Sequence, residues 1–208
     1  MQSKTYKLLE WFIIFIMIPV SFAIHYSIWV KLALGCIGFT YIIYVLLRGE
    51  KQKFKIASHL NWKCFWSQTL IKLFIIAILT SIFVWFTDRE ALFSVLINKP
   101  LKWVILLFVY SFFSVYPQEL IYRTFYFKRY SDIISNPFLF VFINAILFSL
   151  AHIFFANVLV STITFFGGVL FAITYLKTKS TLLVSIEHAI YGSWLFTVGM
   201  GAMLGFPT

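Results

Sequence analysis

The chain has 208 residues, of which 62% are hydrophobic and 12% are charged, and a soluble domain of this length has too little interior for so much apolar surface. The composition therefore excludes a soluble globular protein. The 17 Lys and Arg residues outnumber the 7 Asp and Glu residues, which gives a net charge of +10. Because the basic residues are divided among short loops and form no stripe, we expect them to face anionic lipid headgroups and not nucleic acid.

Apolar runs of about 20 residues recur along the chain, and each predicts a helix long enough to cross a membrane. The expected helices cover residues 8–28, 30–47, 65–86, 101–127, 137–155, 158–176 and 182–204. Lys31 lies at the junction of the first two, which predicts a tight antiparallel pair with almost no loop. Lys72 in the third helix either snorkels to the surface or faces the bundle. Pro117 in the fourth predicts a kink or a loosened hydrogen-bond ladder just before Gln118. Gly167–Gly168 in the sixth allows a neighbouring helix to approach closely.

The basic loops predict a topology for this all-α, polytopic transmembrane helix bundle. The segment 48–55 is short and basic, so the positive-inside rule places it in the cytoplasm. Strict alternation over about seven spans then puts the amino terminus inside and the carboxyl terminus outside, with the basic turns at 128–129 and 177–179 also inside. We divide the chain into N-terminal transmembrane helices 1–3, residues 1–100, and a core of helices 4–7, residues 101–208.

Two charged residues inside an apolar run of the core are the first signal of function. Glu119 and Arg123 lie within the fourth helix, where a charge costs roughly 2.5–3.5 kcal/mol on insertion. Their four-residue separation puts them on one helix face, so they can partly neutralise each other. A purely structural ion pair is one interpretation. Ionisable residues at such depth are by default functional, however, which favours a chemical role for Glu119.

Two histidines occupy comparable places in the core. Asn144, Phe148 and His152 recur at a four-residue spacing, which puts them on one face of the fifth helix, and His188 lies in the seventh. Glu119 and His188 each lie nine residues from a basic helix end, roughly 13 Å at the rise of an α-helix. We therefore expect Glu119, His152 and His188 to converge on one cavity, although His152 fits this depth less well.

A carboxylate and two imidazoles can hold a water and take its proton, which is what attack on an amide carbonyl requires. Glu119, His152 and His188 also form a His₂Glu set of the kind that binds zinc, with water in the fourth position. Both interpretations stay open. The same interior would also suit a proton-coupled transporter, although the two halves of the chain show no inverted repeat.

These residues resemble the motifs of the CAAX-protease and bacteriocin-processing family of intramembrane endopeptidases, also called Abi or type II CAAX prenyl endopeptidase-like proteins. The family patterns Glu-Glu-x-x-x-Arg, Phe-x-x-x-His and His-x-x-x-Asn/Asp correspond here to Gln118-Glu119-x-x-x-Arg123, Phe148-x-x-x-His152 and His188-x-x-x-Gly192. The similarity covers residues 101–206. It implies a peptidase in a bacterial cytoplasmic membrane, with residues 101–208 as its catalytic core. Its glutamate and histidines would activate a water without requiring a tightly held metal.

Two departures from the family pattern bear on activity. Gln118 stands in place of the first glutamate, the residue commonly assigned as the base, and Gly192 stands where an amide or acid is usual. Gln118 cannot take a proton, but its amide can donate a hydrogen bond to a substrate carbonyl. We therefore expect Glu119 to be the base. The alternatives are a silenced enzyme and a non-catalytic relative that binds and shields a membrane partner. Arg123, Asn144 and Phe148 are expected to have structural or orienting roles.

The expected partners are the lipid bilayer and a peptide or membrane-protein substrate. A prenylated peptide, a bacteriocin leader and a membrane protein's own segment would each suit a buried site, and the sequence does not choose between them. No cofactor is firmly expected, and zinc is the open alternative.

Overall fold

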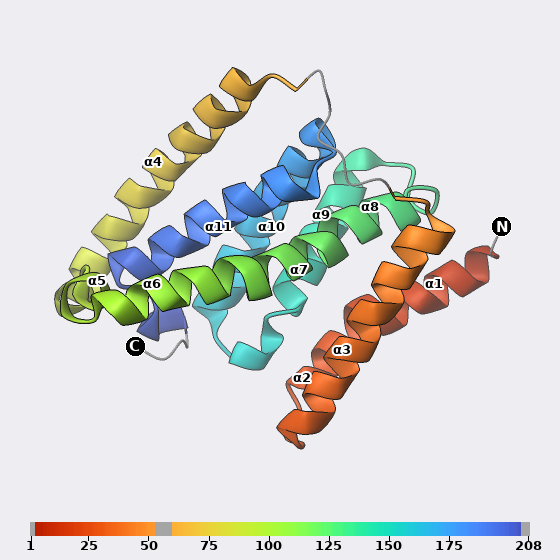
Figure 1. The fold of residues 1–208 in the computed structure, drawn as a ribbon, viewed down its shortest axis with the longest axis horizontal. Coiled ribbons are helices and arrows are strands. Elements are labelled where there is room, and N and C mark those ends of the chain that lie inside the picture. Colours follow the sequence, from red (N-terminus) through yellow and green to blue (C-terminus); the bar gives the residue numbers. More distant parts are fainter. Residues whose placement is uncertain (1–2, 53–59, 205–208) are drawn as a thin grey trace.

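The computed structural model describes residues 3–52 and 60–204, and every regular element in that range is a helix (Figure 1). The α-helices are α1 (Lys4–Phe12), α2 (Ile18–Phe22), α3 (Ile28–Tyr44), α4 (Trp62–Thr87), α5 (Ser94–Asn98), α6 (Pro100–Val109), α7 (Tyr116–Glu119), α8 (Tyr126–Arg129), α9 (Pro137–Leu150), α10 (Val158–Thr178) and α11 (Thr181–Val198). Wide π-helical turns occupy Ile13–Met17, Val45–Gly49, Tyr110–Val115 and Leu120–Phe125, and 3₁₀ turns occupy Arg89–Ala91, Ile153–Phe155 and Ala202–Leu204. Residues 53–55 of the predicted basic loop, and 205–206 of the family resemblance, lie outside the described residues.

Six helical stretches are long and apolar enough to cross a membrane. They are Lys4–Phe22, Ile28–Gly49, Trp62–Thr87, Pro100–Arg129, Pro137–Phe155 and Val158–Thr178. The chain is therefore a polytopic helical membrane protein, as its composition predicts. The seventh predicted helix is present as α11, but its polar residues, among them Glu187 and His188, keep it out of this set. The count of seven spans and the orientation of the termini stay predictions.

Three helix ends differ clearly from the predicted ones. Helix α11 ends at Val198 and not at residue 204, and the next residue, Gly199, takes the left-handed conformation with φ 106°. A polar contact accompanies each of the other two. The first helical stretch ends at Phe22 and not at residue 28, because Lys31 Nζ donates to the Phe22 carbonyl at 2.6 Å and satisfies an open end of that helix. Lys31 therefore lies within the first turns of α3 and not in a junction. Helix α9 ends at Leu150, where the His152 N–H bonds to the Ser149 carbonyl at 2.9 Å and tightens the last turn. The predicted helix face therefore stops short of His152.

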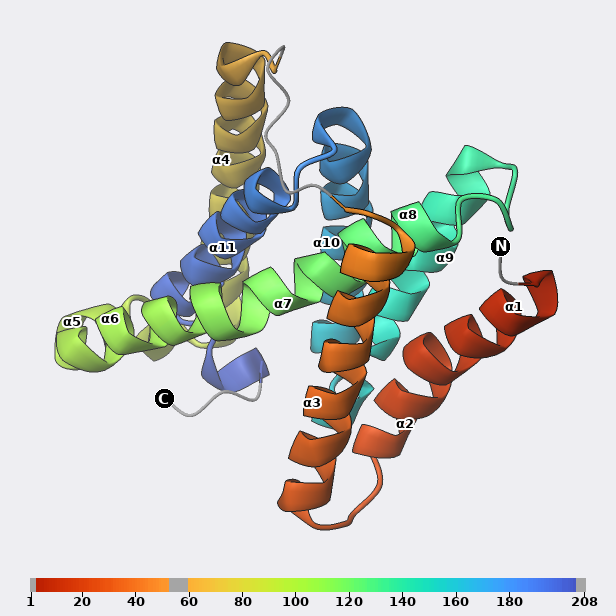
Figure 2. The ribbon, with the colours of Figure 1, turned by 45° about the vertical axis from the view of Figure 1, so that its right-hand side comes forward.

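Helix α4 and the hairpin α1–α3 lie on opposite sides of the helices formed by residues 100–198 (Figures 1 and 2). Within this core, α9 and α10 pack as an antiparallel pair, and α11 contacts α4, α10 and the long helix α6–α8. The close α9–α10 approach depends on Gly168, because a Cβ there would lie 3.0 Å from the Ala145 Cα. The expectation from Gly167–Gly168 is therefore confirmed at Gly168.

Side-chain contacts show which helix ends lie at the same end of the bundle. Lys7 pairs with Asp132 at 2.9 Å, and Arg129 pairs with Glu50 at 2.9 Å. These two ion pairs bring the start of α1, the end of α3 and the turn after α8 to one end of the bundle. Three of the segments assigned to the inside, at the start of α1, the end of α3 and the turn after α8, thus lie together.

The segments assigned to the outside also meet. Asn157 Nδ2 donates to the Met203 carbonyl at 2.7 Å, and Trp103 Nε1 donates to the Thr197 hydroxyl at 3.0 Å. The turn before α10, the end of α11 and the start of α6 are therefore neighbours at the second end of the bundle. The side of the membrane that each end faces stays a prediction.

An aromatic cluster packs the N-terminal hairpin onto the core. Phe15 is fully buried, and its ring centre lies 5.4 to 6.3 Å from those of Tyr122, Phe125, Tyr126 and Tyr130. Three of these four contacts are edge-on, the geometry that the aromatic quadrupole favours. The first helical stretch is therefore fixed against the helix that carries Glu119.

Glu10 adds a buried polar connection beside this cluster. Its carboxylate accepts hydrogen bonds from Arg129 Nε at 2.8 Å, from the Tyr130 hydroxyl at 2.9 Å and from the Tyr41 hydroxyl. The side chains of Glu10 and Arg129 are only 5% and 6% exposed. Burial, together with the Glu10 charge, raises the pKa of the Tyr130 phenol, so this hydroxyl keeps its proton and stays a donor.

We predict that Glu10→Gln lowers the free energy of unfolding by about 3 kcal/mol, because it removes one charge of a buried pair with Arg129. Thermal unfolding of the purified protein in detergent measures this loss. Lys7→Gln is the control, because its partner Asp132 is 63% exposed and such pairs contribute less than about 1 kcal/mol. Equal losses in the two variants would contradict the prediction.

Candidate active site

Helix α6–α8 presents Glu119 where its winding changes. Pro117 lies in the first turn of α7, between the wide turns Tyr110–Val115 and Leu120–Phe125. Proline lacks the N–H of a regular helical bond and its ring crowds the preceding turn, so the ladder loosens there. The predicted loosening before Gln118 is therefore present as a pair of π-helical turns, which are frequent at functional sites.

The Glu119 carboxylate lies between an imidazole and a guanidinium. It is fully buried, with Oε1 at 2.8 Å from His188 Nδ1 and Oε2 at 3.1 Å from Arg123 Nε. The Arg123 N–H groups are not directed at Oε2, so this contact is an ion pair without a hydrogen bond. The predicted shared face of Glu119 and Arg123 and the predicted meeting of Glu119 with His188 are both found. Because a carboxylate accepts, His188 donates from Nδ1 and its Nε2 carries the lone pair.

Arg123 is also fully buried, and it is held by α9 and by its own helix. Its Nη1 donates to the Asn144 side-chain oxygen and lies 3.3 Å from the Tyr122 carbonyl, to which Asn144 Nδ2 donates at 2.7 Å. Its guanidinium carbon lies 4.7 Å from the centre of the Phe148 ring, a cation–π contact. These contacts fit an orienting role for Arg123, Asn144 and Phe148, which stays a prediction.

His152 lies beside this pair and not in direct contact with it. Its Nδ1 is 2.8 Å from the Phe148 carbonyl, which can only accept, so Nε2 presents the lone pair here too. The Phe148 ring centre lies 5.1 Å from that of His152 and 5.7 Å from that of His188. One phenylalanine therefore contacts both imidazoles, and in the described part of the chain no hydrogen bond joins His152 to Glu119.

Gln118 is engaged within its own helix. Its Nε2 donates to the Ser114 hydroxyl at 2.8 Å, while its Oε1 is buried without a hydrogen-bond partner. The amide that the sequence suggests as a donor to substrate is thus partly occupied. Neither atom contacts His188 or His152, so Gln118 is not part of the Glu119–His188 pair.

The second departure from the family pattern, Gly192, has a structural reason. A Cβ at this position would lie 1.9 Å from the Tyr110 hydroxyl oxygen, so the Tyr110 side chain occupies the space that a larger residue would need. The Tyr110 ring is edge-on to His188, with 6.0 Å between centres. Its hydroxyl makes no hydrogen bond to another described residue. Sequence reasoning missed Tyr110, and the glycine one turn after His188 is the only signal that indicated a space there.

The three expected zinc ligands do not form a ligand set. Within residues 3–52 and 60–204, no three His, Cys, Asp or Glu side chains are grouped closely enough to hold a metal ion. The Glu119 carboxylate is instead committed to His188 and Arg123. The arrangement therefore does not fit the predicted site formed by Glu119, His152 and His188.

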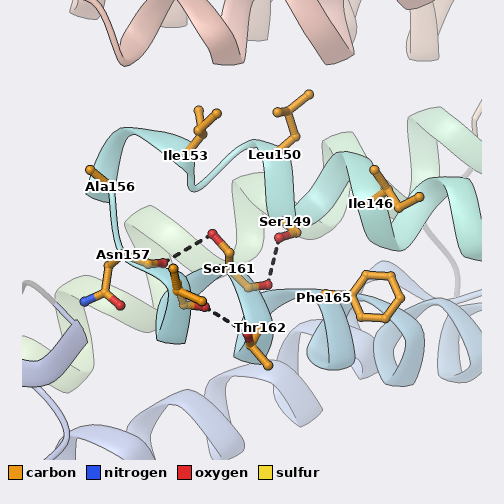
Figure 3. Close-up of a pocket in the computed structure, with 10 residues that line it drawn as sticks. Ile146, Ser149, Leu150, Ile153, Ala156, Asn157, Ser161, Thr162 and Phe165 are labelled. Atoms are coloured by element: carbon orange, nitrogen blue, oxygen red, sulfur yellow. Dashed lines mark hydrogen bonds between the residues drawn. The ribbon is translucent and has the colours of Figure 1, made fainter.

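A hollow of about 600 Å³ lies away from these residues, between the end of α9 and the start of α10 (Figure 3). Its hydroxyl groups are satisfied by backbone carbonyls, since Ser149 donates to Ser161, Ser161 to Asn157 and Thr162 to Val158. No acid or histidine lines it, so it carries none of the chemistry of the Glu119 site.

Comparison with known families agrees with this geometry. The family model described as type II CAAX prenyl endopeptidase Rce1-like matches residues 100–194, a segment that contains Glu119, His152 and His188. This match supports a CAAX-type intramembrane protease at the level of the family and confirms the resemblance of the motifs. No curated protein and no solved structure matches the chain.

We predict that Gly192→Ala destabilises the protein by about 3 kcal/mol, the upper part of the range for overpacking a core, because its new methyl group collides with Tyr110. The midpoint of thermal unfolding in detergent measures the change. Gly35→Ala in α3 is the matched control, because no atom lies within 4 Å of its added Cβ, and a neutral or slightly stabilising effect is expected there. The double variant Tyr110→Ala/Gly192→Ala should recover most of the loss due to the collision. A Gly192→Ala protein as stable as the parent would refute the packing described here.

Proposed function

We propose that this protein is an intramembrane endopeptidase that hydrolyses a peptide bond with a water activated by Glu119, His188 and His152. The observation that carries the proposal is the buried 2.8 Å contact between Glu119 Oε1 and His188 Nδ1 within the segment that matches the family. A carboxylate that holds one imidazole nitrogen leaves the other nitrogen free to take a proton, which is how acid–histidine pairs work in other hydrolases.

In the proposed mechanism the water oxygen attacks the peptide carbonyl while its proton moves to His188 Nε2. The base is then the Glu119–His188 pair, and not Glu119 alone as the sequence suggests. The Glu119 charge stabilises the imidazolium that forms, and Arg123 holds the Glu119 side chain in place. His152 Nε2 accepts a hydrogen bond from the same water and orients it. When the tetrahedral intermediate collapses, the C–N bond breaks and His188 returns its proton to the leaving amine. The products are a carboxylic acid and an amine.

Tyr110 is the proposed donor to the carbonyl oxygen as negative charge develops on it. Its free hydroxyl lies against Gly192, where the resembled family has an amide or acid. A phenol can donate one hydrogen bond in the space of that side chain. The departure at Gly192 is then compensated by a residue from another helix.

The proposed substrates are peptides or membrane-protein segments that reach the bundle from the lipid, and the bilayer is that of a bacterial cytoplasmic membrane. The family description names prenyl endopeptidases. A prenylated peptide is therefore the first probe, and a leader peptide is the second. No zinc step is included, because the expected ligands are not grouped.

The first test compares four proteins in proteoliposomes on an internally quenched peptide with a farnesylated cysteine three residues before its C-terminus. The parent should cleave it, and Glu119→Gln should lose at least about 100-fold in rate because the acid–histidine pair is broken. Glu90→Gln, an exposed acid outside the core, is the control and should match the parent.

Gln118→Glu is the fourth protein in this comparison. It should change the rate modestly or impair it, because a second carboxylate beside Glu119 repels the first. Cleavage by Gln118→Glu alone would show that the sequence as given is inactive. Unchanged cleavage by Glu119→Gln would remove Glu119 from the mechanism, and a Glu119-dependent proton flux without cleavage would favour a transporter.

A second test concerns the Tyr110 hydroxyl. Tyr110→Phe keeps the ring packing and should lower kcat about 100-fold with KM nearly unchanged, the size of effect seen when one donor to an oxyanion is removed. Tyr44→Phe, an exposed tyrosine far from the site, should have no effect. Tyr110→Ala/Gly192→Asn places an amide in the same space and should cleave faster than Tyr110→Ala. Equal kcat for the parent and Tyr110→Phe would refute the assignment.

A further inference from the structure

A cavity of about 390 Å³ lies between the start of α4 and the end of α10, apart from the Glu119 site. Three lysines contribute to its lining, Lys72, Lys177 and Lys179, and no acidic side chain does. Gln68 and Thr174 are among the neutral polar residues that line it. A cavity with this charge attracts an anion that has several oxygen acceptors.

Of the three lysines, Lys72 is held by residues that lie behind the cavity wall. Lys72 Nζ forms an ion pair with the fully buried Glu187 and lies 3.3 Å from the Thr174 hydroxyl oxygen. The Tyr191 hydroxyl donates to the same Glu187 oxygen at 2.8 Å, so the acid is held in turn. Glu187 therefore points away from its neighbour His188 and toward α4. The Glu187 charge balances that of Lys72. It does not balance the charges of Lys177 and Lys179, the two outer lysines of the cavity.

The outer lysines retain donors for a ligand. Within residues 3–52 and 60–204, the hydrogen bond of Lys177 Nζ is to Gln68 Oε1, at the long distance of 3.4 Å, which leaves other N–H donors for a ligand. Lys179 is exposed, has no partner in the described part of the chain, and ends α10 in the left-handed conformation with φ 51°. Thr174 accepts from Lys72, which leaves its own hydroxyl hydrogen free to donate.

The position of the cavity favours a lipid headgroup as its ligand. It lies where one apolar span begins and another ends, which is the level of the lipid headgroups. The adjoining face of α4 is apolar and uncovered, since Ile75 and Leu79, three and seven residues after Lys72, are 52% and 63% exposed. An acyl chain can follow these side chains while its headgroup occupies the cavity. Basic pockets between transmembrane helices bind anionic headgroups in this way.

We propose that this cavity binds the phosphate of an anionic phospholipid headgroup, with phosphate oxygens on Lys177, Lys179 and Thr174 and an acyl chain along α4. This site does not depend on the proposed peptidase activity. It makes no use of Glu119 or His188, and its ligand is a lipid that remains chemically unchanged.

The test is native mass spectrometry of the full-length protein in detergent, titrated with phosphatidylglycerol, with phosphatidylcholine or with inorganic phosphate. We expect phosphatidylglycerol to bind most tightly, and Lys177→Gln/Lys179→Gln to weaken that binding by at least about tenfold, since each lysine near an anionic headgroup contributes to affinity. Lys177→Arg/Lys179→Arg should retain it. Lys99→Gln/Lys102→Gln makes the same change in charge outside the cavity lining and should leave binding unchanged.

Three results would overturn the proposal. One is an equal loss of binding in the Lys99/Lys102 control, which would indicate attraction by net charge alone. Another is inorganic phosphate that binds as tightly as phosphatidylglycerol and competes with it. That result would show that the acyl chain adds nothing to the affinity and would indicate a free-anion site. The third is binding of phosphatidylglycerol and phosphatidylcholine with the same affinity. Thermal unfolding of each variant, measured in parallel, shows whether the protein remains folded in every arm of the titration.

Discussion

The contact on which the core depends is the buried arrangement of Arg123, Glu119 and His188. Burying a charged carboxylate or guanidinium away from water costs several kcal/mol of free energy. Only a close opposite charge and further hydrogen bonds offset that cost. Here Glu119 has a guanidinium on one side and an imidazole on the other, and Asn144 fixes the guanidinium from a third helix. The relative positions of α7, α9 and α11 are therefore set by one polar cluster in an apolar interior. The charges proposed for catalysis also hold these helices together.

The same principle applies at the edge of the bundle. Glu10 reaches Arg129 across 119 positions of sequence and joins the N-terminal hairpin to the helix that carries Glu119. The aromatic rings around Phe15 supply the apolar part of that interface. A displacement of the hairpin would therefore disturb the end of the helix that holds the site. The N-terminal hairpin therefore stabilises the core, although it lies outside the segment that matches the family.

The helices and the central pair could be predicted from sequence because they follow local rules. Apolar runs of membrane-spanning length predict the helices, and equal distances from basic helix ends predict that Glu119 and His188 meet. The helix ends at Phe22 and Leu150 could not be predicted, since they coincide with contacts made by Lys31 and His152 after the chain has turned. The zinc alternative stays a prediction, and the described side chains do not group as its ligands. Spacing along helices gives the depth of His152, but it does not show that the His152 ring turns to the Phe148 carbonyl.

Helix α11 carries polar residues on two faces, and each face contacts a different helix. Glu187 and His188 are consecutive, so their side chains point about 100° apart around the helix axis. His188 faces Glu119 in the core, and Glu187 faces Lys72 on α4. Each charge has its own partner, so α11 can be polar on two sides and still lie inside the bundle. This pairing separates the residues proposed for catalysis from those at the lysine cavity. Gly192 completes the arrangement, because a larger residue there would exclude Tyr110 from its place beside His188.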